Sequence, residues 1–358
     1  MAGKLKIGEI ARRTGLSVST VSRVLAGKLN TSARARTLVL DCARAEGVLE
    51  SVAKANLLFN RLTVFAPARA FDQRADVFYY RIVQGLREAV APFDIHMSVC
   101  ALDESHSDAP LFLRLMSDPA NDAAVIIGID DPAIHEIAAD LGKPVVLVNS
   151  RDRLMRLDAV MPDHRQVGDF AARHLLQHGH RRILVITSLR RFTLEWRLDG
   201  IRDALLDQNI PFDETHALIT TSGFSGSEAE AAMNSFLDRC TPEQMPTAIL
   251  AGGDFMASGV IRALQAHGLS VPRDVSVMSI DGFNLATVGE VELTSVHVAR
   301  EELGGEALAL LQNRLTRPDR PARTHLIGGR LATGASVRRM GKHRGQTVGD
   351  AAPGKLYE

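Results

Sequence analysis

Apolar residues in the first 25 positions recur at a helical spacing. Val21, Val24 and Leu25 fall at i, i+3 and i+4, which predicts one buried face of a short helix. Ser17 is a good N-cap for this helix, and Gly15 permits a tight turn before it. A turn of this kind between two short helices is typical of a helix-turn-helix, so the pattern predicts one at the start of the chain.

The opposite face of the same helix has a different chemistry. Val18, Ser19, Ser22 and Arg23 point away from the predicted core and present small, hydroxyl and cationic groups. Such a face fits the major groove of DNA, where Arg23 is best suited to guanine. The alternative is an ordinary small helical domain with a solvated polar face, because short helix-turn-helix patterns also arise by chance.

A third helix is expected over residues 32–45, with Gly47 as the C′ residue that ends it. The side chains expected to point inward are Leu38, Val39 and Cys42. Arg34 and Arg36 are expected to face solvent or DNA phosphates. Phosphate contacts set the register of a protein on DNA and the salt dependence of binding, without reading the base sequence.

From Leu62 onward, short apolar runs alternate with amphipathic helical segments. In the first half, the expected strands cover residues 62–66, 95–99, 123–127 and 145–148, and the expected helices 76–91, 109–117 and 132–141. After Pro162, the expected helices cover residues 163–178, 194–208, 227–239 and 254–267, and the expected strands 182–186, 217–221, 248–250 and 275–280. This alternation predicts a parallel sheet with helices on both faces in each half.

Two such α/β halves predict two lobes with a cleft between them. Ligands of parallel sheets bind at the carboxyl ends of the strands, so the pattern predicts a small-molecule site in the cleft. No G-x-G-x-x-G follows a strand, and no Walker loop is present. The sequence therefore predicts neither a dinucleotide-binding fold nor a cofactor.

Charge is distributed unevenly along the 358 residues, although the formal net charge is zero. Residues 1–62 hold 11 Lys and Arg against 4 Asp and Glu, whereas the remainder holds 31 against 38. A basic head on an acidic body indicates a nucleic-acid-binding segment attached to a soluble sensor. A basic solvated tail is the alternative, but it does not explain the regular apolar spacing of the head.

Cysteine usage and hydropathy indicate a cytoplasmic protein. Cys42, Cys100 and Cys240 lie far apart with no C-x-x-C pair, which argues against a disulfide framework and a thiolate zinc site. We expect them to be reduced core residues. The N-terminus has no apolar signal core, and no run of about 18 apolar residues occurs, so no membrane partner is expected.

The helix-turn-helix region also carries a family resemblance. The run SVSTVSRVL at residues 17–25, followed by Gly27 and Lys28, matches a known headpiece motif nearly residue for residue. Residues 7–47 resemble the DNA-binding headpiece of the lactose-repressor (LacI) family of bacterial transcription regulators. The similarity continues, less tightly, to about Val337. Its further matching segments are residues 174–175, 179–183, 197–201, 254–259 and 293–296.

The resemblance implies an N-terminal all-α headpiece followed by an α/β, two-lobed, periplasmic-binding-protein-like core. The implied domains are a headpiece over residues 1–47, a hinge over 48–61, an effector-binding and dimerisation core over 62–338 and a tail over 339–358. Within the core, lobe 1 takes about residues 62–160 and 294–321, and lobe 2 takes about 161–291 and 322–338. A final helix near 301–315 would pack on lobe 1, and a strand over 323–331 would return to lobe 2. The tail lacks apolar periodicity and is expected to be disordered.

The hinge departs from the family pattern. The resemblance implies a short hinge helix that forms on DNA and a leucine, Leu57 by position, that enters the minor groove. Val48 to Ser51 replace the usual Tyr-x-Pro-Asn lead-in, although Ser51 can still cap a helix. The alternative is that Leu57 and Leu58 simply pack on the core. The full set of expected DNA contacts is Ser17, Val18, Ser19, Thr20, Ser22, Arg23, Asn30 and Leu57.

Arg197 and Asp281 are the first candidates for effector contacts. Asp281 directly follows an apolar strand, and Arg197 lies near a helix start after another strand. A guanidinium and a carboxylate together suit the vicinal hydroxyls of a sugar or polyol, and the resemblance implies effector contacts for both. The alternative is a surface ion pair. At Gly253 the family's neutral-sugar binders usually carry Asn, so glycine here implies a bulkier effector or different contacts.

Other side chains near the expected strand ends could extend this pocket. Arg190 and Arg191 would favour a phosphorylated or acidic ligand, although a solvated basic loop is equally consistent with them. Aromatic residues that could stack on a ring are Phe71, Phe78, Tyr79 and Phe224, with core packing as the alternative. The full set of expected effector contacts is Phe71, Phe78, Arg190, Arg197, Phe224, Gly253 and Asp281.

These observations predict a sequence-specific DNA-binding transcription regulator that represses a carbohydrate-utilisation operon. It would act as a homodimer on double-stranded operator DNA, under control of a sugar, polyol or sugar phosphate bound between the lobes. The alternative is a sugar-binding protein or an α/β enzyme with a basic N-terminal extension. No H-E-x-x-H or G-x-S-x-G pattern occurs, so neither catalytic residues nor metal ligands are expected.

Overall fold

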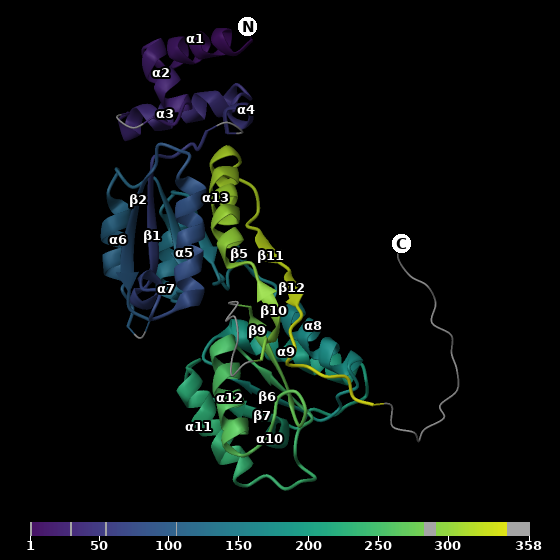
Figure 1. Ribbon diagram of the computed structural model, residues 1–358. Coiled ribbons are helices and arrows are strands. Elements are labelled where there is room, and N and C mark those ends of the chain that lie inside the picture. Colours follow the sequence, from purple (N-terminus) through teal and green to yellow (C-terminus); the bar gives the residue numbers. More distant parts are fainter. Residues whose placement is uncertain (1, 29–30, 54–55, 105, 283–290, 342–358) are drawn as a thin grey trace. The chain divides into compact units, whose positions relative to one another are not determined.

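The computed structural model divides the chain into two compact units (Figure 1). The first unit comprises residues 1–166 and 298–330, and the second comprises residues 167–297 and 331–358. The residues described are 2–28, 31–53, 56–104, 106–282 and 291–341. The chain passes between the units three times. The expected tail therefore lies almost wholly outside the described residues.

The described residues of the headpiece form three helices, α1 Ala2–Thr14, α2 Val18–Leu25 and α3 Ala33–Ala45. The hinge adds α4 Leu49–Ala53. Two serines start helices as N-caps, because Ser17 accepts a hydrogen bond from the Thr20 amide and Ser32 one from the Ala35 amide. Gly47 has φ +64° and ends α3 as predicted. These local signals explain where the helices begin and end.

The headpiece core differs from the prediction at one position. Val39 is fully buried and Cys42 packs against the cluster, but Leu38 is 42% exposed. The buried face of α3 instead consists of Ala35, Val39, Leu40 and Ala43. Leu38 lies about 100° around the helix from Val39, which places it off this face.

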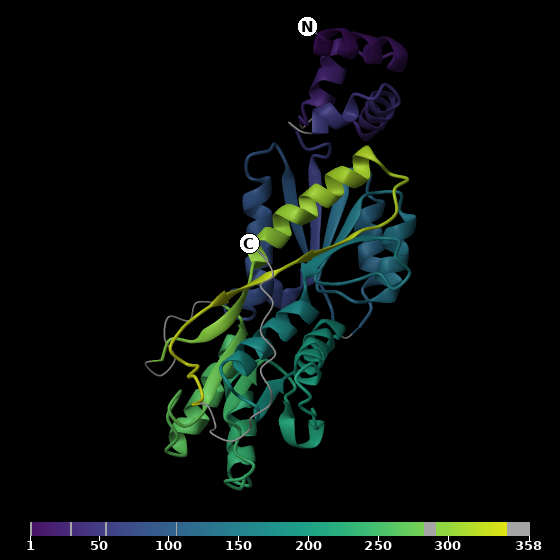
Figure 2. The ribbon, with the colours of Figure 1, turned by 90° about the vertical axis from the view of Figure 1, so that its right-hand side faces the viewer.

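The first unit holds a six-stranded sheet in the order β11-β5-β4-β3-β1-β2. Its strands are β1 Arg61–Pro67, β2 His96–Leu102, β3 Ala123–Ile127, β4 Val145–Val148, β5 Asp158–Pro162 and β11 Thr324–Ile327. Its helices are η1 Ala68–Phe71, α5 Val77–Val90, α6 Ala109–Ser117, α7 Pro132–Asp140 and α13 Arg300–Thr316. Helices α5 and α13 lie side by side over the sheet (Figures 1 and 2). Strands β3 and β4 are buried throughout, as expected for parallel strands covered on both faces.

The second unit repeats this arrangement in the order β12-β10-β9-β8-β6-β7. Its strands are β6 Ile183–Thr187, β7 Leu218–Thr220, β8 Ala248–Ala251, β9 Ser276–Asp281, β10 Thr294–Val298 and β12 Gly329–Ala332. Its helices are α9 Phe192–Leu206, α10 Glu214–Ala217, α11 Gly226–Leu237 and α12 Asp254–Ala266, and α8 His164–Gln177 spans the unit boundary. The pairings of β6 with β7 and β8, of β8 with β9 and of β9 with β10 are parallel. The predicted two-fold α/β alternation is therefore confirmed.

Two predicted boundaries are wrong. Residues 294–297 were expected in the first lobe, but β10 pairs with β9 in the second sheet. The strand expected over residues 323–331 is divided, because β11 pairs with β5 in the first sheet and β12 neighbours β10 in the second. Strand β5 offers β11 an open edge, but it holds only three apolar residues between Asp158 and Pro162. The prediction consequently missed β5 and its pairing with β11.

Among the described residues, no helix has the length and apolar character that a membrane span needs. Cys42, Cys100 and Cys240 are free thiols, and each is half-buried.

Candidate functional site

Helix α2 separates its two faces as predicted. Val21, Val24 and Leu25 are buried in the headpiece core. On the other side, Val18 is 57% exposed, although an apolar side chain gains nothing from contact with water. The polar side chains on this face, Ser17, Ser19, Ser22 and Arg23, are also exposed, and Thr20 is half-buried. A mixed apolar, hydroxyl and cationic surface thus stands open at the start of a helix.

Hydroxyl groups gather at the N-terminus of α2. Ser17 Oγ lies 2.9 Å from Ser19 Oγ and 2.8 Å from Thr20 Oγ1, and it accepts the Thr20 amide at 3.1 Å. Free backbone N–H groups and the helix dipole make such a terminus attractive to an anion such as a DNA phosphate. Asn30, also predicted to contact DNA, lies outside the described residues.

The described residues of the hinge contain one short helix, α4 Leu49–Ala53. Ser51, expected as a helix cap, lies inside this helix, which already starts at Leu49. Leu57 is buried with the core of the first unit, as the alternative of packing on the core predicted. Leu58 is buried with the headpiece core instead. Entry of Leu57 into a minor groove remains a prediction, and it requires that side chain to leave its present site.

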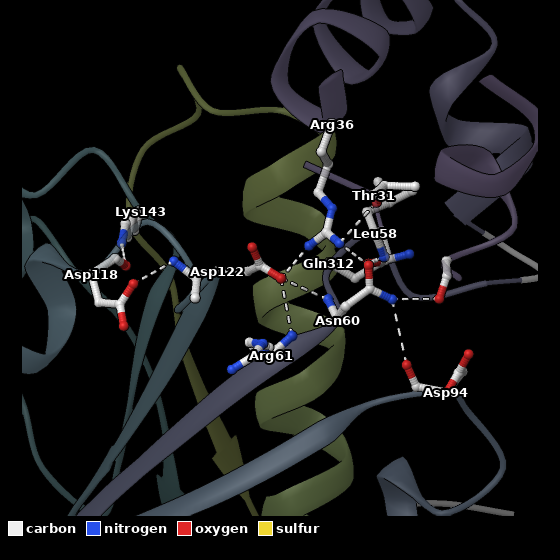
Figure 3. A network of polar contacts seen from close by, with 12 residues as sticks. Thr31, Arg36, Leu58, Asn60, Arg61, Asp94, Asp118, Asp122, Lys143 and Gln312 are labelled. Atoms are coloured by element: carbon white, nitrogen blue, oxygen red, sulfur yellow. Dashed lines mark hydrogen bonds and ion pairs between the residues drawn. The ribbon is translucent and has the colours of Figure 1, made fainter. Parts of the chain in front are cut away.

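A polar network joins the headpiece to the start of the first sheet (Figure 3). Asp122 Oδ2 accepts hydrogen bonds from the backbone amides of Asn60, at 2.9 Å, and Arg61, at 3.0 Å, and it pairs with Arg36 of α3. The buried Asn60 amide contacts Arg36 and donates to the Gly27 carbonyl. The prediction that Arg36 faces solvent or phosphate is therefore wrong for this structure, because a carboxylate 86 residues away holds it.

Gln312, on α13, anchors the hinge from the other side (Figure 3). Its Oε1 accepts the Leu58 amide at 3.0 Å, and its Nε2 donates to the carbonyls of Ala53, at 3.1 Å, and Asn56, at 2.6 Å. Arg44 of α3 donates to the Leu315 carbonyl at 2.8 Å. The hinge backbone is thus hydrogen-bonded to the first unit on two sides.

In the second unit, Arg197 and Asp281 meet at the carboxyl edge of the sheet. Arg197 Nη1 lies 3.2 Å from Asp281 Oδ1 and donates to the Gly252 carbonyl at 2.9 Å. The Arg197 side chain is 4% exposed. Asp281 has φ +107°, an unfavourable conformation for a residue with a side chain, and strain of this kind is concentrated at functional sites. The alternative of a surface ion pair is wrong, because both groups are buried.

The other predicted residues of this unit lie around the pair. A Cβ atom on Gly253 would stand 3.2 Å from Phe224 Cδ1 and 3.3 Å from Asp281 Oδ2. Arg190 Cζ lies 6.0 Å from the centroid of the Phe224 ring. Five residues predicted from separate stretches of sequence therefore come together, and a side chain at position 253 would be crowded against Phe224 and Asp281.

Sequence reasoning gave no role in this edge to two residues that shape it. The buried Asp254 accepts the Ser279 hydroxyl at 2.6 Å and the Gly282 amide at 3.4 Å, so it holds the end of β9 and the glycine that follows it. Thr187 ends β6, and a Cβ atom on Gly252 would lie 2.4 Å from its Oγ1. A polar residue directly at a strand end was the available signal for Thr187.

The carboxyl edge of the first sheet carries a hydrogen-bonded network, of which the sequence analysis named only Tyr79. Asn149, directly after β4, donates to Tyr79 Oη at 3.1 Å, and its Oδ1 lies 2.8 Å from His164 Nε2. All three side chains are buried. Phe71 and Phe78 are half-buried against the core of this unit, so their contact with an effector remains a prediction.

His174 and His178 lie four residues apart on α8, in an H-x-x-x-H spacing. Their ring centroids are 4.3 Å apart, and His178 Nδ1 lies 2.8 Å from the His174 carbonyl. Across the part of the chain that the structure describes, no three His, Cys, Asp or Glu side chains are grouped to hold a metal ion.

Comparison with known proteins agrees with this architecture. Residues 172–337 match the family of periplasmic binding protein-like domains. The transcriptional regulator DegA of Bacillus subtilis, of the helix-turn-helix type, is 28% identical over 309 residues, which cover 85% of this chain and 89% of DegA. The chain thus has a domain of this kind behind a helix-turn-helix, and it aligns with a regulator over most of its length.

The chain is similar over most of its length to transcription regulators of the LacI family. Solved structures share its fold. A complex of the transcriptional regulator CelR with cellobiose has a TM-score of 0.66 at 24% identity and covers 92% of this chain and 99% of its own. A LacI-family regulator from Enterococcus faecium with bound ribose has a TM-score of 0.65 at 22% identity, covering 79% of this chain and all of that one. The chain therefore combines a DNA-binding headpiece with a core of two six-stranded sheets.

Proposed function

We propose that this chain is a LacI-family regulator that represses a carbohydrate-utilisation operon and responds to a sugar, polyol or sugar phosphate bound at the carboxyl edge of its second sheet. The observation that carries the proposal is the buried Arg197–Asp281 pair, with Phe224 and Gly253 beside it. The exposed face of α2 supplies the DNA-reading surface.

On DNA, the residues of α2 would divide the work by chemistry. Val18, Ser19 and Arg23 would meet base edges, with Arg23 donating to a guanine. The hydroxyls of Ser17, Thr20 and Ser22 would hold phosphates, as their position at a helix N-terminus favours. This division separates specificity from salt-dependent affinity.

In the effector site, the two charged groups would divide the hydroxyls of a sugar. Asp281 accepts hydrogen bonds and Arg197 donates them, so adjacent hydroxyls can satisfy both. Phe224 offers an apolar ring face to the C–H face of the sugar. Solved relatives hold ribose and cellobiose, which supports a carbohydrate as the ligand class.

A phosphate on the sugar would find a cation nearby. Arg190 is exposed beside the Phe224 ring. A charge at the rim of the site adds to the affinity for an anionic ligand without changing the contacts to the hydroxyls. Weaker binding of the phosphorylated form than of the plain sugar would contradict this part of the proposal.

The regulator would act as a homodimer, with each headpiece on one half-site of a near-palindromic operator. Strand β2 is an outer strand of the first sheet, and Val99 on it is exposed. Leu113 on α6 is also exposed. An exposed strand edge with apolar side chains is a site where a second copy can pair or pack.

The proposal is tested by selecting bound duplexes from random DNA, with and without a panel of sugars, polyols and their phosphates. A palindromic site whose binding changes with one compound is the expected result. Arg23→Ala should weaken binding to that site by about 1–3 kcal/mol, whereas Arg12→Ala, exposed on α1, should leave it nearly unchanged. Failure to enrich any sequence, under every condition, would overturn the proposal.

A further inference from the structure

A cavity of about 540 Å³ lies within the second unit, at the amino ends of its strands. It is bordered by Arg182 and Ile183 where β6 begins, and by Pro246 just before β8. Leu205 of α9 and Phe236 of α11 close its sides. Its volume falls within the range of sites that hold small molecules.

The cavity is separate from the carboxyl edge of the second sheet, where the effector is proposed to bind. Thr187 and Gly252, which belong to that edge, stand at the carboxyl ends of β6 and β8. Strand β6 has five residues, so its two ends are about 13–17 Å apart. No role proposed above uses the residues of this cavity.

The lining pairs an apolar floor with cationic groups. Leu205, Ile210, Phe212 and Phe236 contribute apolar side chains. Three guanidinium groups, those of Arg181, Arg182 and Arg239, also line the cavity, and none of them forms an ion pair with any residue that the structure describes.

The sole carboxylate in the lining is already engaged. Asp213 Oδ2 lies 2.6 Å from His216 Nδ1, and this hydrogen bond holds the pKa of Asp213 below its ordinary value. Among the arginines, Arg181 donates to the carbonyls of Leu176 and His180, and Arg239 Nε donates to the Ser235 carbonyl. Arg182 and the outer nitrogens of Arg239 remain to meet a ligand.

We propose that this cavity is a second ligand site, which takes a small organic anion with an apolar body, such as an aromatic carboxylate, sulfonate or phosphate. The apolar body would lie on the side chains of the floor and lose contact with water. The anionic group would accept charge-assisted hydrogen bonds from Arg182 and Arg239.

The test compares two fluorescent probes that differ only by an anionic group. 8-Anilinonaphthalene-1-sulfonate carries a sulfonate, and N-phenyl-1-naphthylamine has the same apolar body without it. The full-length protein should bind the sulfonate saturably, one molecule per chain, and should bind the neutral probe about tenfold more weakly. Equal affinity for the two probes would overturn the proposal.

Variants then locate the site. Arg182→Gln combined with Arg239→Gln should weaken binding of the sulfonate about tenfold and leave the neutral probe unchanged. Arg273→Gln removes an exposed arginine elsewhere in the unit and should change neither affinity. If the double variant fails to fold, each single variant should still weaken sulfonate binding by about threefold, and unchanged affinity in both would contradict the proposal.

Cys240 gives an independent report of occupancy, because its half-buried thiol lines the cavity. In a protein with Cys42→Ser and Cys100→Ser, N-ethylmaleimide should alkylate Cys240 alone. The sulfonate, at about 10 times its Kd, should slow this alkylation by about tenfold. An unchanged rate of alkylation in the presence of bound probe would place the probe elsewhere and overturn the assignment.

Discussion

The two sheets have equivalent strand orders, but protein covers the amino edge of the first sheet and a cavity borders that of the second. In the first unit, the starts of β1 and β3 are covered by the headpiece, which Asp122 and Asn60 hold there (Figure 3). In the second unit, the equivalent starts of β6 and β8 border the open cavity. The topology thus provides the same edge twice, and a few polar side chains decide whether protein covers it.

The carboxyl edges differ as well. The first sheet ends in the hydrogen-bonded Tyr79–Asn149–His164 network, whereas the second ends in the Arg197–Asp281 ion pair. Loss of one hydrogen bond lowers the free energy of unfolding modestly, whereas loss of one partner of a buried ion pair lowers it strongly. The two sheets thus share their strand order but differ in the groups at their carboxyl edges.

Removing the charge at the second carboxyl edge should have the largest effect. Arg197→Ala leaves Asp281 as a buried carboxylate without its ion-pair partner, so the free energy of unfolding should fall by about 3–5 kcal/mol. Urea denaturation measures this change, and the effector response should also disappear. Arg202→Ala breaks surface ion pairs with Asp199 and Glu214 and a cation–π contact with Phe212, and should cost about 1–2 kcal/mol. Similar losses in the two variants would remove the contrast between the edges.

Removing the acceptor at the first amino edge should come next. Asp122→Ala leaves the amides of Asn60 and Arg61 and the Arg36 guanidinium without this carboxylate, which should lower the free energy of unfolding by about 2–3 kcal/mol. Hydrogen exchange should accelerate in α3 and at the start of β1. Asp41→Ala, exposed on α3, is the matched control and should leave exchange unchanged. Unaltered exchange after Asp122→Ala would show that the headpiece does not depend on this network.

Substitution in the hydrogen-bonded network at the carboxyl edge of the first sheet should lower stability less. Asn149→Ala removes the hydrogen bonds to Tyr79 and His164 and places alanine at φ +51°, so the expected loss of stability is about 1–3 kcal/mol. Asn149→Gly removes the same amide but tolerates the backbone conformation, and it separates the two contributions. A loss equal to that of Arg197→Ala would contradict the proposed difference between the two carboxyl edges.

The smallest expected effect is a loss of stability at acid pH, caused by His174 of the second unit. Burial, together with the nearby His178 and His180, lowers the pKa of His174 to about 4 from its ordinary 6.5. Above about pH 6.5 the ring is neutral in both states, but between pH 6.5 and 4 the unfolded chain takes up a proton that the folded chain does not. The free energy of unfolding should therefore decrease by about 1–2 kcal/mol as the pH is lowered through this window. His174→Gln should flatten the curve measured by urea denaturation, whereas the exposed His106→Gln should not.

Local patterns in the sequence were sufficient for most elements. Strands β3 and β4 and helix α6 have the bounds that their residues predicted, and the two faces of α2 separate as its spacing required. Caps at Ser17, Ser32 and Gly47 set the helix ends. Periodicity and capping depend on neighbours within one or two turns, so one stretch of sequence carries the whole signal.

Only the tertiary structure decided which distant groups meet. Asn60 and Asp122 are 62 residues apart, and Tyr79 and Asn149 are 70 apart, so no local pattern pairs them. Arg36 looked like a DNA-facing cation until a carboxylate of the first sheet engaged it. The division of residues 323–331 between two sheets and the cavity at β6 and β8 have the same origin. Burial and hydrogen bonding of such groups depend on how strands order themselves in space, and this is a property of the whole chain.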